Sequence, residues 1–249
     1  MEKEKYYEYI NKKYKVTFTE NDKTTLKCSQ CLSGILALDK KSLVYDETQE
    51  SKYLHNDRYW EPSYIDYIYS CSFICNTCNG RTFSCGTGYH AEYSSHDENV
   101  DFPKFIPKYF SPFIPLFNVH KSCPKSVVCN LNDSFNLAWA DISASANKLR
   151  IAIECLLVEV DPELDKFRKL HKRIEYFAKK QPDIAKLLMA IKWLGNEASH
   201  EASLKEHDLA FAYEVMELAL NKLFDKSEEK LHELVALVNK NEGKPFSEW

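Results

Sequence analysis

The chain has 249 residues, of which 44% are hydrophobic and 28% charged, and its net charge is −4 at pH 7. These values suit a globular chain that buries a core, and the slight acidity argues against binding nucleic acid through bulk charge. No apolar run approaches the roughly 18 residues of a membrane helix, no secretory signal is recognisable, and the six glycines form no phosphate-binding loop. We therefore expect a cytoplasmic protein without membrane contact.

The first 130 residues read as short extended pieces. Runs at 15–19, 35–38 and 64–69 are rich in aromatic and β-branched residues and are separated by polar turns, as strands usually are. The sequence therefore predicts an α+β chain in which residues 1–100 form a β-rich domain.

Cysteines give the sharpest signal in this domain. Nine cysteines in a chain without an export signal indicate metal binding or free thiols. Cys28 and Cys31 form one CxxC pair, Cys75 and Cys78 form another, and a glycine follows each pair within three residues. Two such turns bring four sulfurs around one ion, which leaves no position for water. The sequence predicts one structural Zn²⁺ in a zinc ribbon, although the 43 residues between the pairs exceed the usual spacing.

Two further cysteines flank the second pair. Cys71 alternates with aromatic residues and is expected to pack inside one face of a strand. Cys85 with His90 and His96 would give a second metal site, but their loose spacing favours ordinary surface histidines.

Residues 101–130 contain five prolines among phenylalanines and tyrosines. Prolines at this density exclude helix and interior strand, because each removes a backbone donor. We expect an extended connector that is held by its aromatic side chains.

Residues 131–249 are predicted to be helical. Apolar residues recur at steps of three and four from Phe135 to Val160, which predicts a long first helix. Short connections between four or five helices predict an antiparallel bundle. Helix-starting signals recur through this half, at 132–134, 161–163, 181–183, 203–206 and Ser227.

The second of these helices has a basic excess, which could hold phosphates or could be an ordinary solvated face. Its basic residues are Lys166, Arg168, Lys169, Lys172, Arg173, Lys179 and Lys180.

The third helix is expected to end at Gly195, and the element Gly195-Asn196-Glu197-Ala198-Ser199-His200 follows it, between the last two main helices. This GN-x3-H element resembles the HEPN superfamily, many of whose members are metal-independent ribonucleases with an R-x4-6-H motif. More narrowly, the chain looks like a bacterial family that joins an N-terminal zinc ribbon to HEPN-like helices and is often encoded near restriction–modification and other defence genes. The proline-rich segment ending in Cys123-Pro124 and the alanine-rich first helix also match. The resemblance covers about 25–225 and implies a HEPN-like bundle over 131–249.

Metal-free RNA cleavage needs a base for the 2′-hydroxyl and a cation for the charge that develops on phosphate. His200 would be the base, and Asn196, one helical turn earlier, would orient its ring or bind a ribose hydroxyl. The arginine window of the motif holds no basic residue, so Arg150 or Lys192 would supply the positive charge. Arg150 could instead pair with Glu154 four residues later, and His200 could be a structural histidine.

Two functions remain open. One is a prokaryotic antiphage (antiviral) defence protein that acts on RNA or nucleotide, a metal-independent endoribonuclease if His200 is catalytic. In the resembling nucleases two motifs often meet across a dimer, which implies a homodimer through the third and fourth helices. The other is a non-catalytic zinc-binding adaptor, a subunit of a defence complex that docks on a larger nuclease or translocase. The missing motif arginine favours the adaptor, whereas His200 with Asn196 favours action on RNA.

Overall fold

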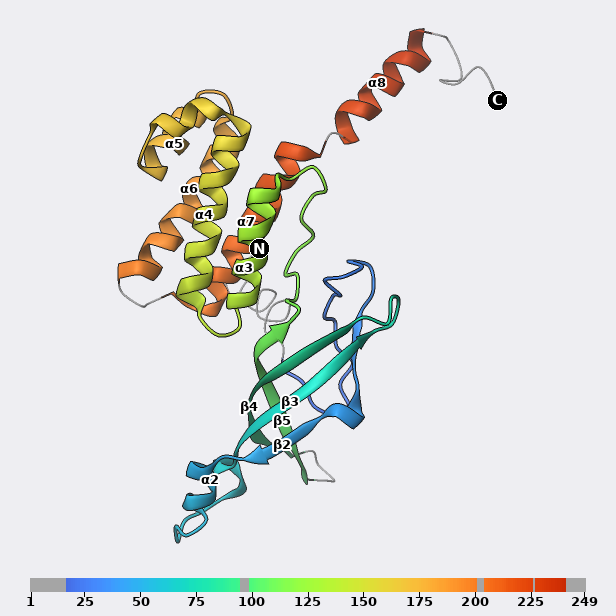
Figure 1. Cartoon of the computed structure of the whole chain (residues 1–249), viewed down its shortest axis with the longest axis vertical. Coiled ribbons are helices and arrows are strands. Elements are labelled where there is room, and N and C mark those ends of the chain that lie inside the picture. Colours follow the sequence, from blue (N-terminus) through green and yellow to red (C-terminus); the bar gives the residue numbers. More distant parts are fainter. Residues whose placement is uncertain (1–16, 95–98, 201–203, 226, 241–249) are drawn as a thin grey trace.

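The computed structural model describes residues 17–94, 99–200, 204–225 and 227–240, and the side chains of 92–94, 99–101, 196–200 and 227–229 lie outside the described part. Within these ranges the chain is mixed: an antiparallel sheet comes first and a helical region follows (Figure 1). The predicted α+β class is confirmed at this level.

Five strands form the sheet. The strand order is β1-β3-β4-β5, and β2 also pairs with β3, so β1 and β2 share one edge of β3. The short helix α2 (Gln49–Leu54) follows β2 and lies at the end of the sheet remote from the other helices (Figure 1). The strands are β1 (Leu36–Leu38), β2 (Val44–Glu47), β3 (Asp66–Cys75), β4 (Arg81–Ser94) and β5 (Asn99–Ser111).

One face of this sheet is packed. Alternation along β3 buries Tyr69, Cys71 and Phe73, as the sequence pattern predicts for Cys71. The Phe18 ring meets the rings of Tyr69 and Phe73 edge-on, each at a centroid distance of 5.4 Å. The strand expected at 15–19 is, among the described residues, a single bridge between Phe18 and Phe105. Further residues of this core are Leu26, Cys28, Leu36, Cys75, Phe105, Phe110 and Ile114.

The proline-rich connector expected over 101–130 is wrong at both ends: its first third belongs to strand β5, and residues 125–130 begin a helix. This strand pairs with β4 along its length and otherwise exchanges backbone hydrogen bonds only with Phe18, among the described residues. Phe105 directs its N–H outward to Phe18, so Pro103 and Pro107, two residues on either side, also occupy outward positions. Proline is tolerated there because no ladder bond to β4 is lost.

The helical region comprises six α-helices among the described residues. Five of them gather together, whereas α8 projects away from the others (Figure 1). The helices are α3 (Lys125–Leu137), α4 (Ile142–Val160), α5 (Leu170–Phe177), α6 (Pro182–His200), α7 (Glu206–Phe224) and α8 (Ser227–Lys240).

The long first helix predicted through Val160 is two helices. The chain turns over 138–141, and the Asp141 carboxylate accepts a hydrogen bond from the Ala144 amide at 2.8 Å, which caps α4. The apolar periodicity continues across this turn because α3 and α4 bury side chains in the same core. Periodicity alone therefore cannot reveal the break.

Other helix starts differ in detail from the predictions. The second predicted helix is a 3-10 helix (Pro162–Lys166) followed by α5, and α6 continues through Gly195 to His200. Helix α7 is capped by Asp208, whose carboxylate accepts from the Lys205 amide at 3.0 Å. The expected cap Ser203 lies outside the described residues.

The bundle core is aliphatic with one buried hydroxyl cluster. The Tyr213 hydroxyl on α7 lies 2.8 Å from Ser134 Oγ on α3 and 2.7 Å from Ser145 Oγ on α4. All three residues are buried, so these bonds fix the relative positions of three helices.

The sheet and the bundle meet at the turn between α3 and α4. Trp139 of that turn packs edge-on against Phe110 of β5, with ring centroids 4.9 Å apart. Phe110 belongs to the packed face of the sheet, so the bundle contacts that side. Among the described residues, every helix is too short or too polar to cross a bilayer.

Candidate metal centre

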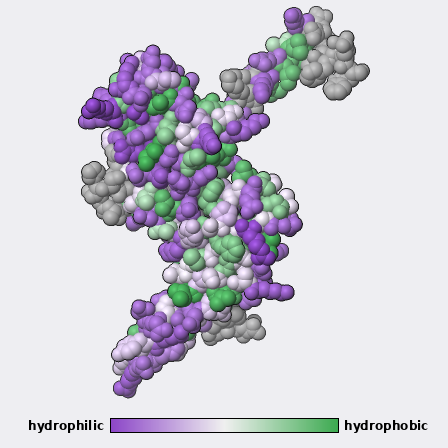
Figure 2. Space-filling model, viewed as in Figure 1, coloured by the Kyte–Doolittle hydropathy of each residue, from purple (hydrophilic) through white to green (hydrophobic). Residues whose placement is uncertain are grey.

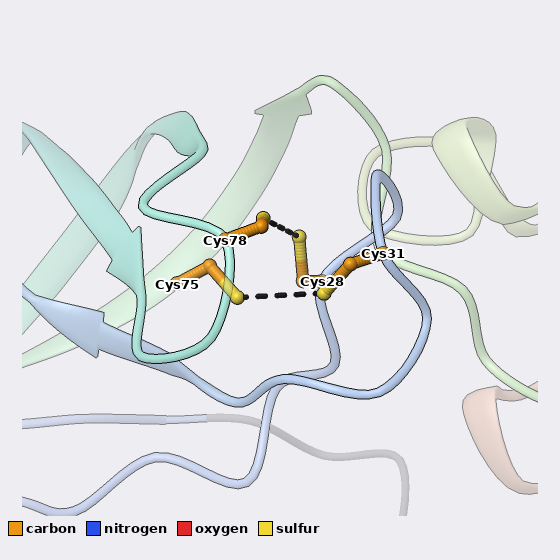
Figure 3. Close-up of side chains that lie close together, drawn as sticks. All are labelled: Cys28, Cys31, Cys75 and Cys78. Carbon is orange, nitrogen blue, oxygen red and sulfur yellow. Dashed lines mark hydrogen bonds between the residues drawn. The ribbon is translucent and has the colours of Figure 1, made fainter.

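The four predicted cysteine ligands meet at one point. The Sγ atoms of Cys28 and Cys78 are 3.7 Å apart, and those of Cys31 and Cys75 are 3.6 Å apart (Figure 3). All four sulfurs lie within 4.8 Å of one another. A tetrahedron with metal–sulfur bonds of about 2.3 Å has sulfur–sulfur edges of about 3.8 Å, so the cluster has the size needed to hold a metal ion.

Two similar turns hold these sulfurs. In the first, the Leu32 amide donates to the Cys28 carbonyl at 3.0 Å; in the second, the Asn79 amide donates to the Cys75 carbonyl at 3.1 Å. Leu32 and Asn79 are the non-glycine residues with a positive φ among the described residues, at 59° and 57°. Each turn thus closes with a left-handed residue directly after its second cysteine, and the glycine of each turn follows later in the chain.

Backbone amides inside the turns point at the sulfurs. Gln30 N lies 3.4 Å from Cys28 Sγ, and Thr77 N lies 3.4 Å from Cys75 Sγ. The Gly34 amide lies 3.3 Å from Cys31 Sγ. These donors favour thiolates, which are the form that binds metal.

The two turns also bind each other. Asn76 of the second turn donates its amide to the Ile35 carbonyl at 3.0 Å, and its side-chain oxygen accepts from the Ile35 amide at 2.9 Å. Gln30 of the first turn donates its side-chain nitrogen to the Arg81 carbonyl at 3.4 Å. Sequence reasoning missed Gln30 and Asn76, and their only signal was their place inside a CxxC pair.

The glycines of the turns are needed for space. A Cβ at Gly34 would overlap Cys75 Sγ and the Thr77 side chain, and a Cβ at Gly80 would overlap the Gln30 side chain. Neither glycine has a positive φ. Each glycine therefore permits the close approach of the opposite turn.

The thiols differ in acidity. Hydrogen bonds from the Ser33 side chain and then from the Ser33 and Gly34 amides lower the pKa of Cys31 to about 6. The Cys78 and Thr77 amides lower the pKa of Cys75. The Gly80 amide lowers the pKa of Cys78, but desolvation and the three neighbouring thiols outweigh it and raise that pKa to about 12. One thiol of each pair is therefore ready to bind a cation.

The flanking residues do not extend the cluster. Burial raises the pKa of the Cys71 thiol to about 12, which leaves it protonated at neutral pH. His90 Nδ1 lies 3.1 Å from the Tyr67 hydroxyl, and His96 lies outside the described residues. Within the described part of the chain, the four cysteines are the only group of three or more ligand-type side chains close enough to hold an ion.

The helical candidates lie on α4 and α6. The side chains of Asn196 and His200 lie outside the described part, although α6 extends to His200. Arg150 of α4 faces α6 at Gly195, where an added Cβ would lie 3.8 Å from Arg150 Cβ. Arg150 also pairs with Glu154 at 3.3 Å, as its spacing predicts, while its Nε is buried without a hydrogen-bond partner among the described atoms.

Lys192 lies in the same neighbourhood. The residue is only 8% exposed, and its Nζ lies 3.4 Å from the ring centroid of Trp193, which is 54% exposed. Desolvation, and then the charge of Arg150, lower the pKa of Lys192. Arg150 is therefore near enough to Lys192 for their charges to interact, and among the described residues Lys192 has no carboxylate partner.

Neighbouring carboxylates neutralise much of the basic excess of the second predicted helix (residues 166–180). Carboxylates pair with four of its basic residues, which favours the solvated-face interpretation. The pairs are Lys166–Glu163, Lys172–Glu175, Arg173–Asp165 and Lys180–Asp161.

Comparison with known families divides the chain at the same place as the fold. Residues 16–117 match a domain of unknown function, DUF8608. Residues 132–241 match a second domain of unknown function, DUF4145. Neither match covers half of the chain. No curated protein and no solved structure matches the chain.

Proposed function

We propose that the chain is a prokaryotic antiphage-defence protein in which a structural zinc site supports a HEPN-like bundle that acts on RNA or nucleotide, cleaving RNA through His200. One observation carries this proposal. Arg150 of α4 faces Gly195 of α6 and interacts with the charge of Lys192, and α6 continues from there to Asn196 and His200. Arg150 is paired with Glu154, whereas Lys192 is buried and has no carboxylate partner among the described residues, so the charge of Lys192 favours an anion nearby.

Zinc is the metal that best fits the cysteine cluster. Four sulfurs at tetrahedral spacing suit Zn²⁺, and four thiolates leave no coordination position for water or substrate. We therefore assign the ion a structural role, remote in sequence from the proposed reaction.

The bundle residues would divide the chemistry. His200 would take the proton of the ribose 2′-hydroxyl, and Asn196 would orient the imidazole or bind ribose. Arg150 and Lys192 would stabilise the charge on the phosphate, in place of the arginine that the motif lacks. The pairing of motifs across a homodimer through α6 and α7 remains part of this proposal.

The test is RNA cleavage by the zinc-loaded protein in EDTA, with zinc content measured afterwards. We expect products that end in a cyclic phosphate, and we expect His200→Ala to lose at least 100-fold in rate, as loss of a general base does. His232→Ala on α8 is the matched control and should keep full activity. Full activity of His200→Ala, or early melting of that variant, would place His200 in the scaffold.

The positive charge of the proposed site is tested separately, at Lys192. Lys192→Gln should lower the cleavage rate, whereas Lys186→Gln, on the same helix but exposed and paired with Asp183, should not. Equal rates for both variants would remove Lys192 from the proposed site.

A second candidate, the adaptor, is favoured by α8. Four apolar residues on this projecting helix are exposed, namely Leu231, Leu234, Val235 and Leu237. Their spacing makes an apolar stripe suited to a helical partner. Phage protection in cells separates the candidates: an adaptor would lose protection with Leu234→Glu and keep it with His200→Ala, and the ribonuclease would lose it with His200→Ala.

A further inference from the structure

The sheet has a second face, opposite its packed core. Residues 81, 83 and 85 of β4 point to this face, because Thr82 and Ser84 between them are buried. The register places Val44, Ser70, Cys85 and Tyr109 in one row across four strands. The neighbouring rows hold Ile68 and Phe83. We call this surface the open face.

Two aromatic rings dominate the open face. Phe83 is 60% exposed and Tyr109 is 48% exposed. Phe83 stands opposite Ser111 and Tyr109 opposite Cys85, so the two rings are diagonal neighbours on adjacent strands. Among the described residues neither ring contacts another aromatic ring, and both are free to stack on a ligand.

Basic groups border the two rings. Arg81 lies two residues before Phe83, and its guanidinium is held over the face by Ser72 Oγ at 3.0 Å and Asp39 at 2.9 Å. Lys108 is the extra residue of the bulge beside Tyr109 and is exposed. Neither Lys104 nor Lys108 has a carboxylate partner in the described part of the chain.

The acidic groups near the rings are paired: Asp39 forms an ion pair with Arg81 at 2.9 Å. Asp46, at one edge, is neutralised by two hydrogen bonds from Lys52 at 2.9 and 3.0 Å. Asp66 lies in the row of Tyr89 and Lys104, away from Phe83. The β5 side of the open face is therefore apolar, aromatic and cationic.

Most of this face is uncovered by the described elements; the exception is Ser72, opposite Phe83, which is buried beneath Ser42 and Arg81. Trp139 attaches the bundle to the packed side through Phe110. Pale and green residues gather over the strands, between the purple surface of α2 and that of the bundle (Figure 2). The exposure of Ile68 and Val44, at 55% and 65%, agrees with an uncovered sheet.

We propose that the open face binds single-stranded nucleic acid, with bases stacked on Phe83 and Tyr109 and phosphates held by Lys108 and Arg81. Aromatic rings on adjacent strands bind unpaired bases without regard to sequence, and neighbouring cations follow the backbone. Uncharged aliphatic residues around the rings suit the faces and edges of bases. The site lies in the sheet, so it stands independently of the proposed cleavage in the bundle.

The direct test is fluorescence anisotropy of a 12-nucleotide oligo(U) or oligo(dT) with zinc-loaded full-length protein. We expect both single strands to bind more tightly than a duplex. Phe83→Ala with Tyr109→Ala should weaken binding by roughly 5- to 100-fold per ring. Tyr53→Ala with Tyr59→Ala is the matched control, because these tyrosines are exposed beside the sheet but off the open face. His200→Ala should bind as the unchanged protein does.

Cys85 supplies an internal probe, because it lies in the row of Tyr109 and is exposed. Bound oligonucleotide should slow its alkylation, while exposed Cys129 on α3 should react at an unchanged rate. Three results would overturn the proposal: no binding at low salt, equal binding by the two-ring variant, or a dimer that dissociates when the rings are removed while no oligonucleotide binds.

Discussion

The two halves of the molecule reach stability by different means. Among the described residues, the sheet core has eleven buried hydrophobic residues, two of which are candidate metal ligands, whereas the bundle core has twenty-six. One face of the sheet stays exposed, while the bundle buries side chains from five helices around one centre. A small core of this kind needs additional stabilisation, such as a structural metal ion, and a large aliphatic core does not. We therefore expect metal binding to determine the stability of the sheet and to have almost no effect on the stability of the bundle.

Removing one sulfur should give the largest contrast between the halves. Cys28→Ser breaks the tetrahedron, and structural zinc sites contribute about 10 kcal/mol or more to folding. We expect loss of bound zinc and rapid proteolysis of residues 17–111, while helical circular dichroism is retained. Cys129→Ser, an exposed cysteine on α3, should change neither signal. If helical circular dichroism is lost together with the bound zinc, the two halves fold as one unit.

Adding one methyl group between the turns should act on the sheet alone. Gly34→Ala places a Cβ against Cys75 Sγ, so the turns must separate. We expect a weakening of zinc affinity by roughly 10- to 100-fold, comparable to the loss of a partner that positions a ligand. Competition with a chromophoric chelator measures this, and an unchanged affinity would mean that the two turns can move apart at little cost.

The bundle should respond to loss of a buried hydroxyl. Tyr213→Phe removes the oxygen that binds Ser134 and Ser145, although the two serines keep bonds to each other's backbone carbonyls at 2.8 and 2.9 Å. We expect a loss of about 1 kcal/mol in the free energy of unfolding of the bundle. Urea denaturation followed by helical circular dichroism reports it, and zinc affinity should not change.

The smallest effect should have the opposite sign. Gly195 lies inside α6, and an added Cβ would meet Ala146 O and Arg150 Cβ at 3.8 Å, which is ordinary contact. Gly195→Ala should stabilise the bundle by up to about 1 kcal/mol, because alanine restricts the unfolded chain. A lower melting temperature would indicate that this position needs the close approach of another group.

Local patterns predicted the four-cysteine cluster and the helical half. A CxxC pair fixes its own turn, so the sequence alone was enough to name Cys28, Cys31, Cys75 and Cys78. Apolar periodicity likewise located the bundle, but it ran through the α3–α4 turn, since both helices face one core. Helix α4 starts where the Asp141 side chain caps it. Nothing in the sequence distinguishes this capping aspartate from the other aspartates of the chain.

Features that depend on distant pairing could not be predicted. From sequence, the prolines of β5 indicate a connector, because proline lacks an N–H group. Proline disrupts a strand only where that missing N–H would face a neighbouring strand, and the sequence does not show which positions face outward. The proximity of Arg150 and Lys192 results from the crossing of α4 and α6 near Gly195. Phe83 and Tyr109 gave no signal, because an exposed strand aromatic and a buried one have the same sequence pattern. The proposed roles of Asn196 and His200 remain predictions, because their side chains lie outside the described part of the chain.

The long separation of the two cysteine turns has a consequence for how the protein is made. At synthesis rates of roughly 5–20 residues per second, the second turn leaves the ribosome roughly 2–10 s after the first. During that interval Cys28 and Cys31 would offer a metal ion only half of the four-sulfur cluster. Strand β1, made soon after the first turn, also has no partner until residues 73–75 of β3 emerge with the second turn. We expect the yield of folded sheet in a cell to follow the supply of metal during those seconds.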